Sequence, residues 1–121
     1  MVSRLTQWTL DVRDATRMAA FWSAALGYEI DRDGQHLRPP PDAPGAPTVW
    51  LQPCAGDKTT KNRAHPDLHA PDGDVAAEVE RLLTLGATRA DVGQTGGEGF
   101  TVLADPEGNE FCLIHDPWRR T

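Results

Sequence analysis

The residues best suited to chemistry in this sequence are His65, Asp67 and His69, which alternate along one stretch. Alternate side chains of a β-strand point to the same face, so these three share one surface if the stretch is a strand. Three polar side chains are costly in a dry core, because each buried polar group needs a hydrogen-bond partner. The Asp either orients an imidazole toward a ligand or forms a structural salt link with a histidine. We interpret this face as the polar wall of a ligand-binding pocket.

A second candidate for chemistry is Glu110, which follows the sequence DPEGN and opens the last expected strand. Glu110 is either a pocket residue able to move a proton or half of a buried ion pair with Lys or Arg. Cys112 and Ile114 share its strand face, and we interpret Cys112 as a small buried hydrophobic residue rather than a nucleophile. The sequence has no GxSxG, HExxH or Walker pattern.

These residues must be positioned by a regular succession of strands and helices. In the first half, Asp14 is a typical helix N-cap and Gly27 a typical helix end, with an apolar stripe between them. Asp33-Gly34 predicts a hairpin. The expected strands are Leu5–Val12, Tyr28–Arg32, Gln35–Arg38 and Thr48–Gln52, with a proline-rich loop over Pro39–Pro47.

The second half repeats this order. Asp74 or Asp72 caps a helix that ends at Gly86, and the expected strands are Ala64–Ala70, Ala87–Val92, Phe100–Ala104 and Glu110–His115. The spacing Gln7 to His65 equals the spacing Gln52 to Glu110, which indicates an internal repeat. We therefore predict an α+β fold of two βαβββ modules whose curled mixed sheets pair around a cleft. The expected single domain, 1–121, comprises module one (1–53), a linker (54–63), module two (64–116) and a tail (117–121).

The chain resembles the vicinal oxygen chelate superfamily, and specifically a small glyoxalase-like, or bleomycin-resistance-like, domain. The resemblance is carried by LTQWTLDVRDATRMAAFWSAALGY, KNRAHPDLHAPDGDVAAEVERLLTLGA and DPEGNEFCLI, which cover more than half of the chain. It implies the paired βαβββ fold and, in members that bind metal, a pocket with one ligand from each of four strands.

The resemblance implies metal ligands at Gln7, Gln52, His65 and Glu110. His65 and Glu110 match the family pattern, Gln7 is one of the residue types used at its position, and Gln52 departs from the usual Glu. The set then carries one negative charge, which lowers metal affinity and leaves Glu110 as the catalytic proton-transfer residue. The cofactor is either a divalent ion (Ni, Zn, Mn or Fe) or none. Trp50 shares a face with Gln52 and either stacks on a ligand or belongs to the core.

Composition limits the classes of partner. A net charge of -6 and a pI near 5.0 argue against nucleic acid. We expect no membrane span and no signal peptide, and therefore a cytoplasmic protein. Ten Arg against two Lys indicate a bacterial source. Lys58, Lys61 and Arg63 are interpreted as a solvated loop face. Relatives of this size lead us to expect a homodimer.

Three hypotheses for function follow. The first is a glyoxalase-like lyase or isomerase acting on a small oxygen-rich substrate, with Glu110 as base. The alternative is a metal-free protein of the same fold that binds and sequesters a drug or metabolite. An extradiol-type dioxygenase is disfavoured, because position 7 is not His and the chain is short.

Overall fold

The computed structural model describes residues 1–54 and 56–116, so the expected tail, 117–121, lies outside the described residues. The chain divides into two compact units, Met1–Asp57 and Lys58–Thr121. Each unit contains one helix and its own four-stranded sheet, in the order strand, helix, three strands. The predicted α+β class with two βαβββ modules is confirmed.

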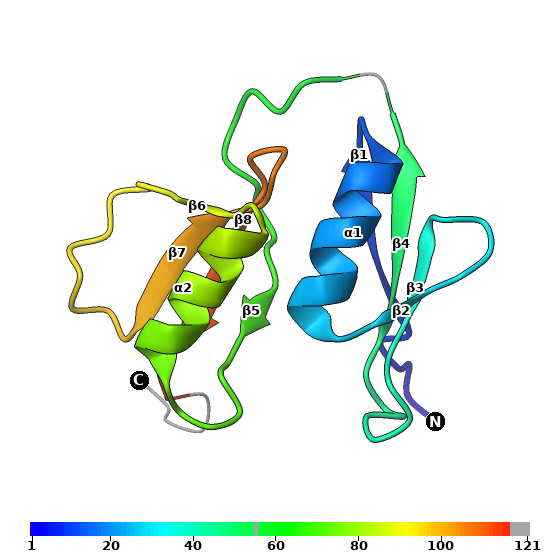
Figure 1. Ribbon diagram of the computed structural model, residues 1–121, viewed down its shortest axis with the longest axis horizontal. Coiled ribbons are helices and arrows are strands. Elements are labelled where there is room, and N and C mark those ends of the chain that lie inside the picture. Colours follow the sequence, from blue (N-terminus) through cyan, green and yellow to red (C-terminus); the bar gives the residue numbers. More distant parts are fainter. Residues whose placement is uncertain (55, 117–121) are drawn as a thin grey trace. The chain divides into compact units, whose positions relative to one another are not determined.

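Unit 1 is built around a parallel strand pair. Its sheet has the order β1-β4-β3-β2, in which β1 and β4 run parallel and the other neighbours antiparallel. Helix α1 lies along one face of this sheet (Figure 1). The elements are β1 (Gln7–Val12), α1 (Ala15–Leu26), β2 (Glu29–Ile30), β3 (His36–Arg38) and β4 (Thr48–Pro53).

Local signals set the limits of α1 as the sequence predicts. The Asp14 side chain accepts a hydrogen bond from the Arg17 backbone N–H, and Gly27 ends the helix in the left-handed conformation, with φ of 70°. The buried face of α1 includes Trp22, which is 1% exposed. Its ring makes edge contacts with Trp8 and Phe21, at centroid distances of 5.2 Å and 5.1 Å.

The hairpin predicted at Asp33-Gly34 is present, but its loop is longer than two residues. Ile30 pairs with Leu37, and the Asp33 carboxylate accepts hydrogen bonds from the backbone N–H groups of Gln35 and His36. The strand expected over Tyr28–Arg32 therefore shortens to Glu29–Ile30. It is an edge strand, so only one neighbour can extend it.

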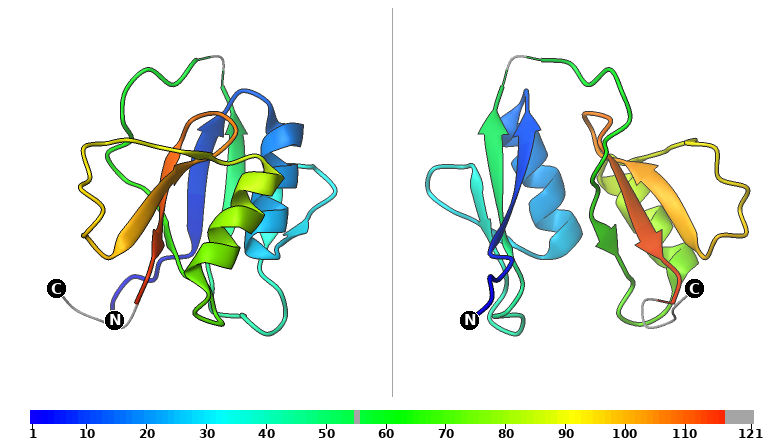
Figure 2. Two further views of the ribbon diagram at one scale, coloured as in Figure 1. Left: turned by 60° about the vertical axis from the view of Figure 1, so that its left-hand side comes forward. Right: turned by 180° about the vertical axis from the view of Figure 1, so that it is seen from behind.

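Unit 2 repeats this arrangement with the sheet order β5-β8-β7-β6, in which β5 and β8 are parallel. Of the two predicted caps, Asp74 is the one that accepts a hydrogen bond from the Ala77 backbone N–H. Helix α2 lies along one face of its sheet (Figure 2). The elements are β5 (Asp67–Leu68), α2 (Val75–Leu85), β6 (Thr88–Arg89), β7 (Phe100–Ala104) and β8 (Glu110–Ile114).

The turn between β7 and β8 is fixed by one buried carboxylate. Asp105 is 2% exposed. Its Oδ1 accepts hydrogen bonds from the backbone N–H groups of Glu107 and Asn109, at 3.0 Å and 2.9 Å. The Asn109 side-chain amide also donates to Asp105. This network determines where β8 begins, and so positions Glu110.

No helix in the described part of the chain is long and apolar enough to cross a membrane.

Candidate functional site

A pocket of about 280 Å³ lies within unit 2. Its apolar wall includes Phe100 and Val102 of β7. Its polar and sulfur-bearing lining comes from the start of β5, from β8 and from the segment before β5, and consists of Lys61, His65, Asp67, Glu110 and Cys112. Side chains able to bind metal or move protons therefore meet an apolar surface, the usual composition of a small-molecule site.

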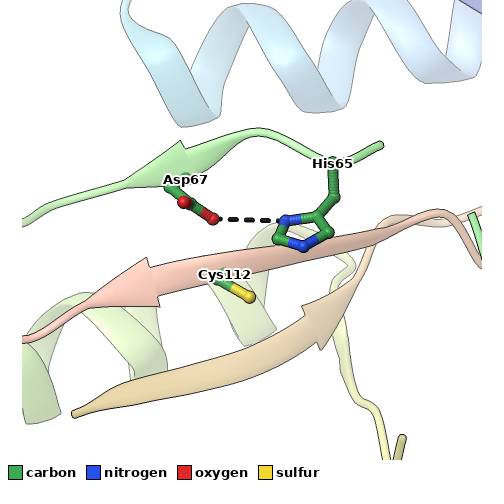
Figure 3. Close-up of side chains that lie close together, drawn as sticks. All are labelled: His65, Asp67 and Cys112. Atoms are coloured by element: carbon green, nitrogen blue, oxygen red, sulfur yellow. Dashed lines mark ion pairs between the residues drawn. The ribbon is translucent and has the colours of Figure 1, made fainter. Parts of the chain in front are cut away.

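His65, Asp67 and Cys112 form the tightest group in this pocket. Nδ1 of His65 lies 3.2 Å from Oδ1 of Asp67. One ligand atom from each of the three side chains lies within 4.8 Å of the others. Figure 3 shows Cys112 reaching this group from β8, beside the imidazole. The alternation of His65 and Asp67, together with the pairing of Asp67 with Cys112 across β5 and β8, produces this arrangement.

Cys112 is 7% exposed, which confirms its prediction as a buried residue. Burial raises the pKa of the thiol, and the neighbouring Asp67 carboxylate raises it further, while Lys61 acts in the opposite direction. The thiol is therefore protonated at neutral pH and is a poor nucleophile in the absence of a cation.

Glu110 is also buried, with a side chain 6% exposed. Lys58 Nζ is 2.7 Å from its Oε2, and the Asn62 backbone N–H donates to its Oε1 at 3.0 Å. Burial alone would raise the pKa of Glu110, but Lys58 and the Asn62 N–H outweigh that effect and hold the pKa below its usual value. Glu110 is therefore a carboxylate at neutral pH.

These contacts correct the prediction that Lys58 belongs to a solvated loop face. Its side chain is only 20% exposed, because it covers the Glu110 carboxylate. Asn62 adds a second link to the β7–β8 turn, through a 3.3 Å hydrogen bond from its side-chain amide to Asn109 Oδ1. Lys61 and Arg63 are exposed as predicted, although Lys61 also lines the pocket. The sequence gives no local signal for the Lys58 contact.

His69 is exposed and is not among the described residues that line this pocket. Strand β5 ends at Leu68, so the alternation that unites His65 and Asp67 does not continue to His69. His69 as a ligand-binding residue stays a prediction.

Gln7, Trp50 and Gln52 belong to unit 1, where the strand register separates the two glutamines. Gln7 lies opposite Thr48, and Gln52 opposite Asp11. Four residues along a strand span about 13 Å, so the structure does not bring Gln7 and Gln52 together.

Both side chains instead make local hydrogen bonds. The Thr48 hydroxyl donates to Gln7 Oε1 at 2.9 Å, and Trp50 Nε1 donates to Gln52 Oε1 at 2.9 Å. The half-buried Trp50 ring also makes an edge contact with His36, at a centroid distance of 5.8 Å. Gln7 corresponds to His65 in the repeat, and so Thr9 corresponds to Asp67. Thr9 lies opposite Trp50 and Asp67 lies opposite Cys112, so Trp50 corresponds to Cys112. Two residues earlier on each strand, Thr48 therefore corresponds to Glu110.

The chain matches the model of the glyoxalase-like domain family over residues 7–114. A comparison with curated protein sequences finds no significant match.

Solved structures with a similar fold include fosfomycin resistance proteins and a glyoxalase/bleomycin resistance protein/dioxygenase family enzyme. One similar structure is a glyoxalase/bleomycin resistance protein/dioxygenase family enzyme from Burkholderia phytofirmans, with 17% identity, coverage of 92% of this chain and 97% of the other, and a TM-score of 0.65. Another is the fosfomycin resistance protein FosX from Listeria monocytogenes, with 21% identity, coverage of 96% and 93%, and a TM-score of 0.70. A mutant of that FosX, 20% identical over 95% of this chain and 91% of the other with a TM-score of 0.68, is complexed with Mn(II) and 1S,2S-dihydroxypropylphosphonic acid. At these identities the likeness concerns the fold.

Proposed function

Because this chain belongs to the glyoxalase-like domain family, we propose that it is a lyase or isomerase acting on a small oxygen-rich substrate with the help of a divalent metal ion. The observation that carries the proposal is that His65 and Glu110 line one pocket. Extending the pairing of Asp67 with Cys112 by two residues places His65, in the segment just before β5, opposite Glu110 at the start of β8.

The surroundings of Glu110 fit a metal ion. Its Oε2 is buried and has no hydrogen bond of good geometry among the described residues, so the 2.7 Å contact with Lys58 is an ion pair. A buried carboxylate needs a compensating cation, and the lysine supplies one. A divalent ion fits the same place once the flexible Lys58 side chain withdraws.

His65 and Glu110 would hold the ion, with His65 oriented by its neighbour. Asp67 engages Nδ1 of the imidazole, which leaves the lone pair of Nε2 for the metal. Gln7 and Gln52 as further ligands, and Trp50 as a stacking residue, stay predictions that concern unit 1. We also propose that the protein is cytoplasmic and forms a homodimer, and light scattering tests the dimer directly.

The residues of unit 2 divide the chemistry between them. A bound divalent ion would polarise adjacent oxygens of the substrate. Glu110 accepts the proton, because Lys58 and the Asn62 N–H keep its pKa below the usual value and its carboxylate is therefore ionised at neutral pH. Phe100 and Val102 contact the carbon skeleton and exclude water from it.

The ion pair itself supports a second candidate function, a metal-free protein that binds and sequesters a small molecule. If Lys58 stays on Glu110, the carboxylate is neutralised without metal and the pocket is a receptor lined by apolar side chains. Ligand binding would then be independent of added metal.

Turnover distinguishes the two functions. Metal-stripped protein is reloaded separately with Ni²⁺, Zn²⁺, Mn²⁺ or Fe²⁺ and assayed with an α-keto hemithioacetal and with fosfomycin. We expect metal-dependent turnover of one substrate that falls about 100-fold in Glu110→Gln and is unchanged in Cys54→Ser, whose sulfur lies in unit 1. Absence of turnover with all four metals would overturn the enzymatic proposal.

A further inference from the structure

We propose that His65, Asp67 and Cys112 form a separate binding site for thiophilic divalent ions such as Zn²⁺, hereafter the thiophilic site. It goes beyond the proposed function, because it uses neither Glu110 nor any residue of unit 1. It shares His65 with the metal centre proposed above and takes as a ligand the Asp67 that orients His65 there, so the two sites are mutually exclusive.

The geometry of the three side chains is close to that of a bound ion. A tetrahedral Zn²⁺ with ligands at about 2.0 to 2.3 Å brings ligand atoms to about 3.5 Å from one another. His65 Nδ1 and Asp67 Oδ1 are already 3.2 Å apart, and no separation within the group exceeds 4.8 Å. Closing the largest gap takes a movement of about 1 Å. The His65 and Asp67 side chains are 32% and 52% exposed, so both can rotate to make it.

Cys112 provides the fixed point of the thiophilic site. It lies in β8 between two paired strands, opposite Asp67 of β5 and Val102 of β7. Its Sγ is therefore held by the sheet, while the two exposed ligands adjust around it. This division between one rigid and two adjustable ligands allows the site to close on an ion without a change in the backbone.

The chemistry of the donors favours a soft ion over a hard one. Thiolate ligands select Zn²⁺ and similar ions, whereas Mn²⁺ and Mg²⁺ prefer oxygen ligands. Once its thiol proton is released on binding, Cys112 contributes a second negative charge beside Asp67. The two charges together balance a divalent cation. Glu110 offers one charge, which Lys58 already compensates.

The thiophilic site leaves one coordination position open toward the pocket. Three protein ligands complete all but one corner of a tetrahedron, and the three residues line the cavity of about 280 Å³. Water or an oxygen or sulfur atom of a small ligand would fill the fourth position. An ion bound here would also withdraw His65 from Glu110, so zinc would compete with the metal of the proposed function.

Cobalt spectroscopy of the full chain tests this proposal. Metal-stripped protein is titrated with Co²⁺, and thiolate coordination is detected as a charge-transfer band in the near ultraviolet. We expect the band to saturate at one equivalent in the wild type, to persist in Glu110→Gln, and to disappear in Cys112→Ser. The exposed Cys54 of unit 1 provides the matched control, and Cys54→Ser is expected to keep the band.

A protection measurement covers the case in which Cys112→Ser fails to fold. In Cys54→Ser the remaining thiol is Cys112, and one equivalent of Zn²⁺ is expected to slow its alkylation at least tenfold. Absence of a thiolate band at saturating Co²⁺, or a band that survives Cys112→Ser, would overturn the thiophilic site. Unchanged alkylation in the presence of Zn²⁺ would do the same. None of these results bears on Mn²⁺ binding through Glu110, so the proposed function fails or stands separately.

Discussion

Lys58 Nζ lies 2.7 Å from Oε2 of Glu110, so the segment that leads into the second module neutralises the carboxylate that begins its last strand. The two residues are far apart in sequence and mostly buried in unit 2. In metal-free protein this contact balances the charge of Glu110. Metal binding at Glu110 must therefore displace the lysine, which links stability to metal content.

Lys58→Met is expected to destabilise the metal-free protein by about 1 to 3 kcal/mol, because it leaves a buried carboxylate oxygen without a partner. Urea unfolding measures the difference. Lys61→Met, which removes an exposed lysine from the same segment, is the control and should change stability by less than about 0.5 kcal/mol. Equal stability of the two variants would show that the ion pair contributes nothing.

Glu110→Gln is expected to change the pH dependence of stability. The pKa of Glu110 lies below its ordinary value of 4.5, so its stabilising effect is complete above that pH and is lost as the pH falls through the lowered pKa. The variant should be less stable than the wild type at neutral pH, and the two should converge in acid. Unfolding free energies between about pH 7 and about pH 3 provide the test. A constant difference across that range would contradict it, and the exposed Glu80→Gln serves as control.

Asp105→Ala is expected to cost about 3 kcal/mol, because it removes a buried carboxylate that accepts hydrogen bonds from two backbone N–H groups and an amide. It should also weaken any metal binding through Glu110, since the turn sets the start of β8. Asp72→Ala removes an exposed carboxylate that accepts from one backbone N–H, and should cost less than about 1 kcal/mol. Similar costs for the two variants would argue against a special role for the buried turn.

Gly27→Ala is expected to destabilise unit 1 by about 1 kcal/mol. Gly27 has φ of 70°, and a Cβ added there would meet no other atom within 4 Å, so the cost is one of backbone conformation alone. Gly45 has equally open surroundings without a positive φ, and Gly45→Ala should be neutral or slightly stabilising. Chemical denaturation of both variants checks the difference, and a neutral Gly27→Ala would refute this explanation of the helix end.

The sequence predicted the elements whose signals are local. Asp14 and Gly27 define α1, and the central strands β4, β7 and β8 begin where expected. The short strands β2, β5 and β6 were predicted too long. Each lies at the edge of its sheet, and the length of an edge strand depends on its one partner rather than on its own residues.

Only those contacts of the site that follow from alternation along a single strand could be predicted from the sequence. Alternation brought His65 and Asp67 together, and the shared face of Glu110 and Cys112 was also visible in the sequence. The contact of Lys58 with Glu110 joins residues that are distant in sequence. Lys58 lies in a polar loop, and a polar composition predicts a solvated loop rather than a buried contact. The repeat spacing also led to a wrong correspondence between Gln52 and Glu110, because the strand registers of the two sheets differ. Thr9 lies opposite Trp50 in unit 1, whereas Asp67 lies opposite Cys112 in unit 2.

Calorimetric titration of metal-stripped protein with Mn²⁺ is the most direct test of metal binding through Glu110. We predict one equivalent bound by the wild type, no measurable binding by Glu110→Gln, and binding about tenfold tighter by Lys58→Met, because no ammonium then has to be displaced from Oε2. Cys112→Ser should bind Mn²⁺ as the wild type does, since manganese prefers oxygen ligands to sulfur. Absence of Mn²⁺ binding by the wild type, or equal binding by Glu110→Gln, would contradict a metal centre at His65 and Glu110.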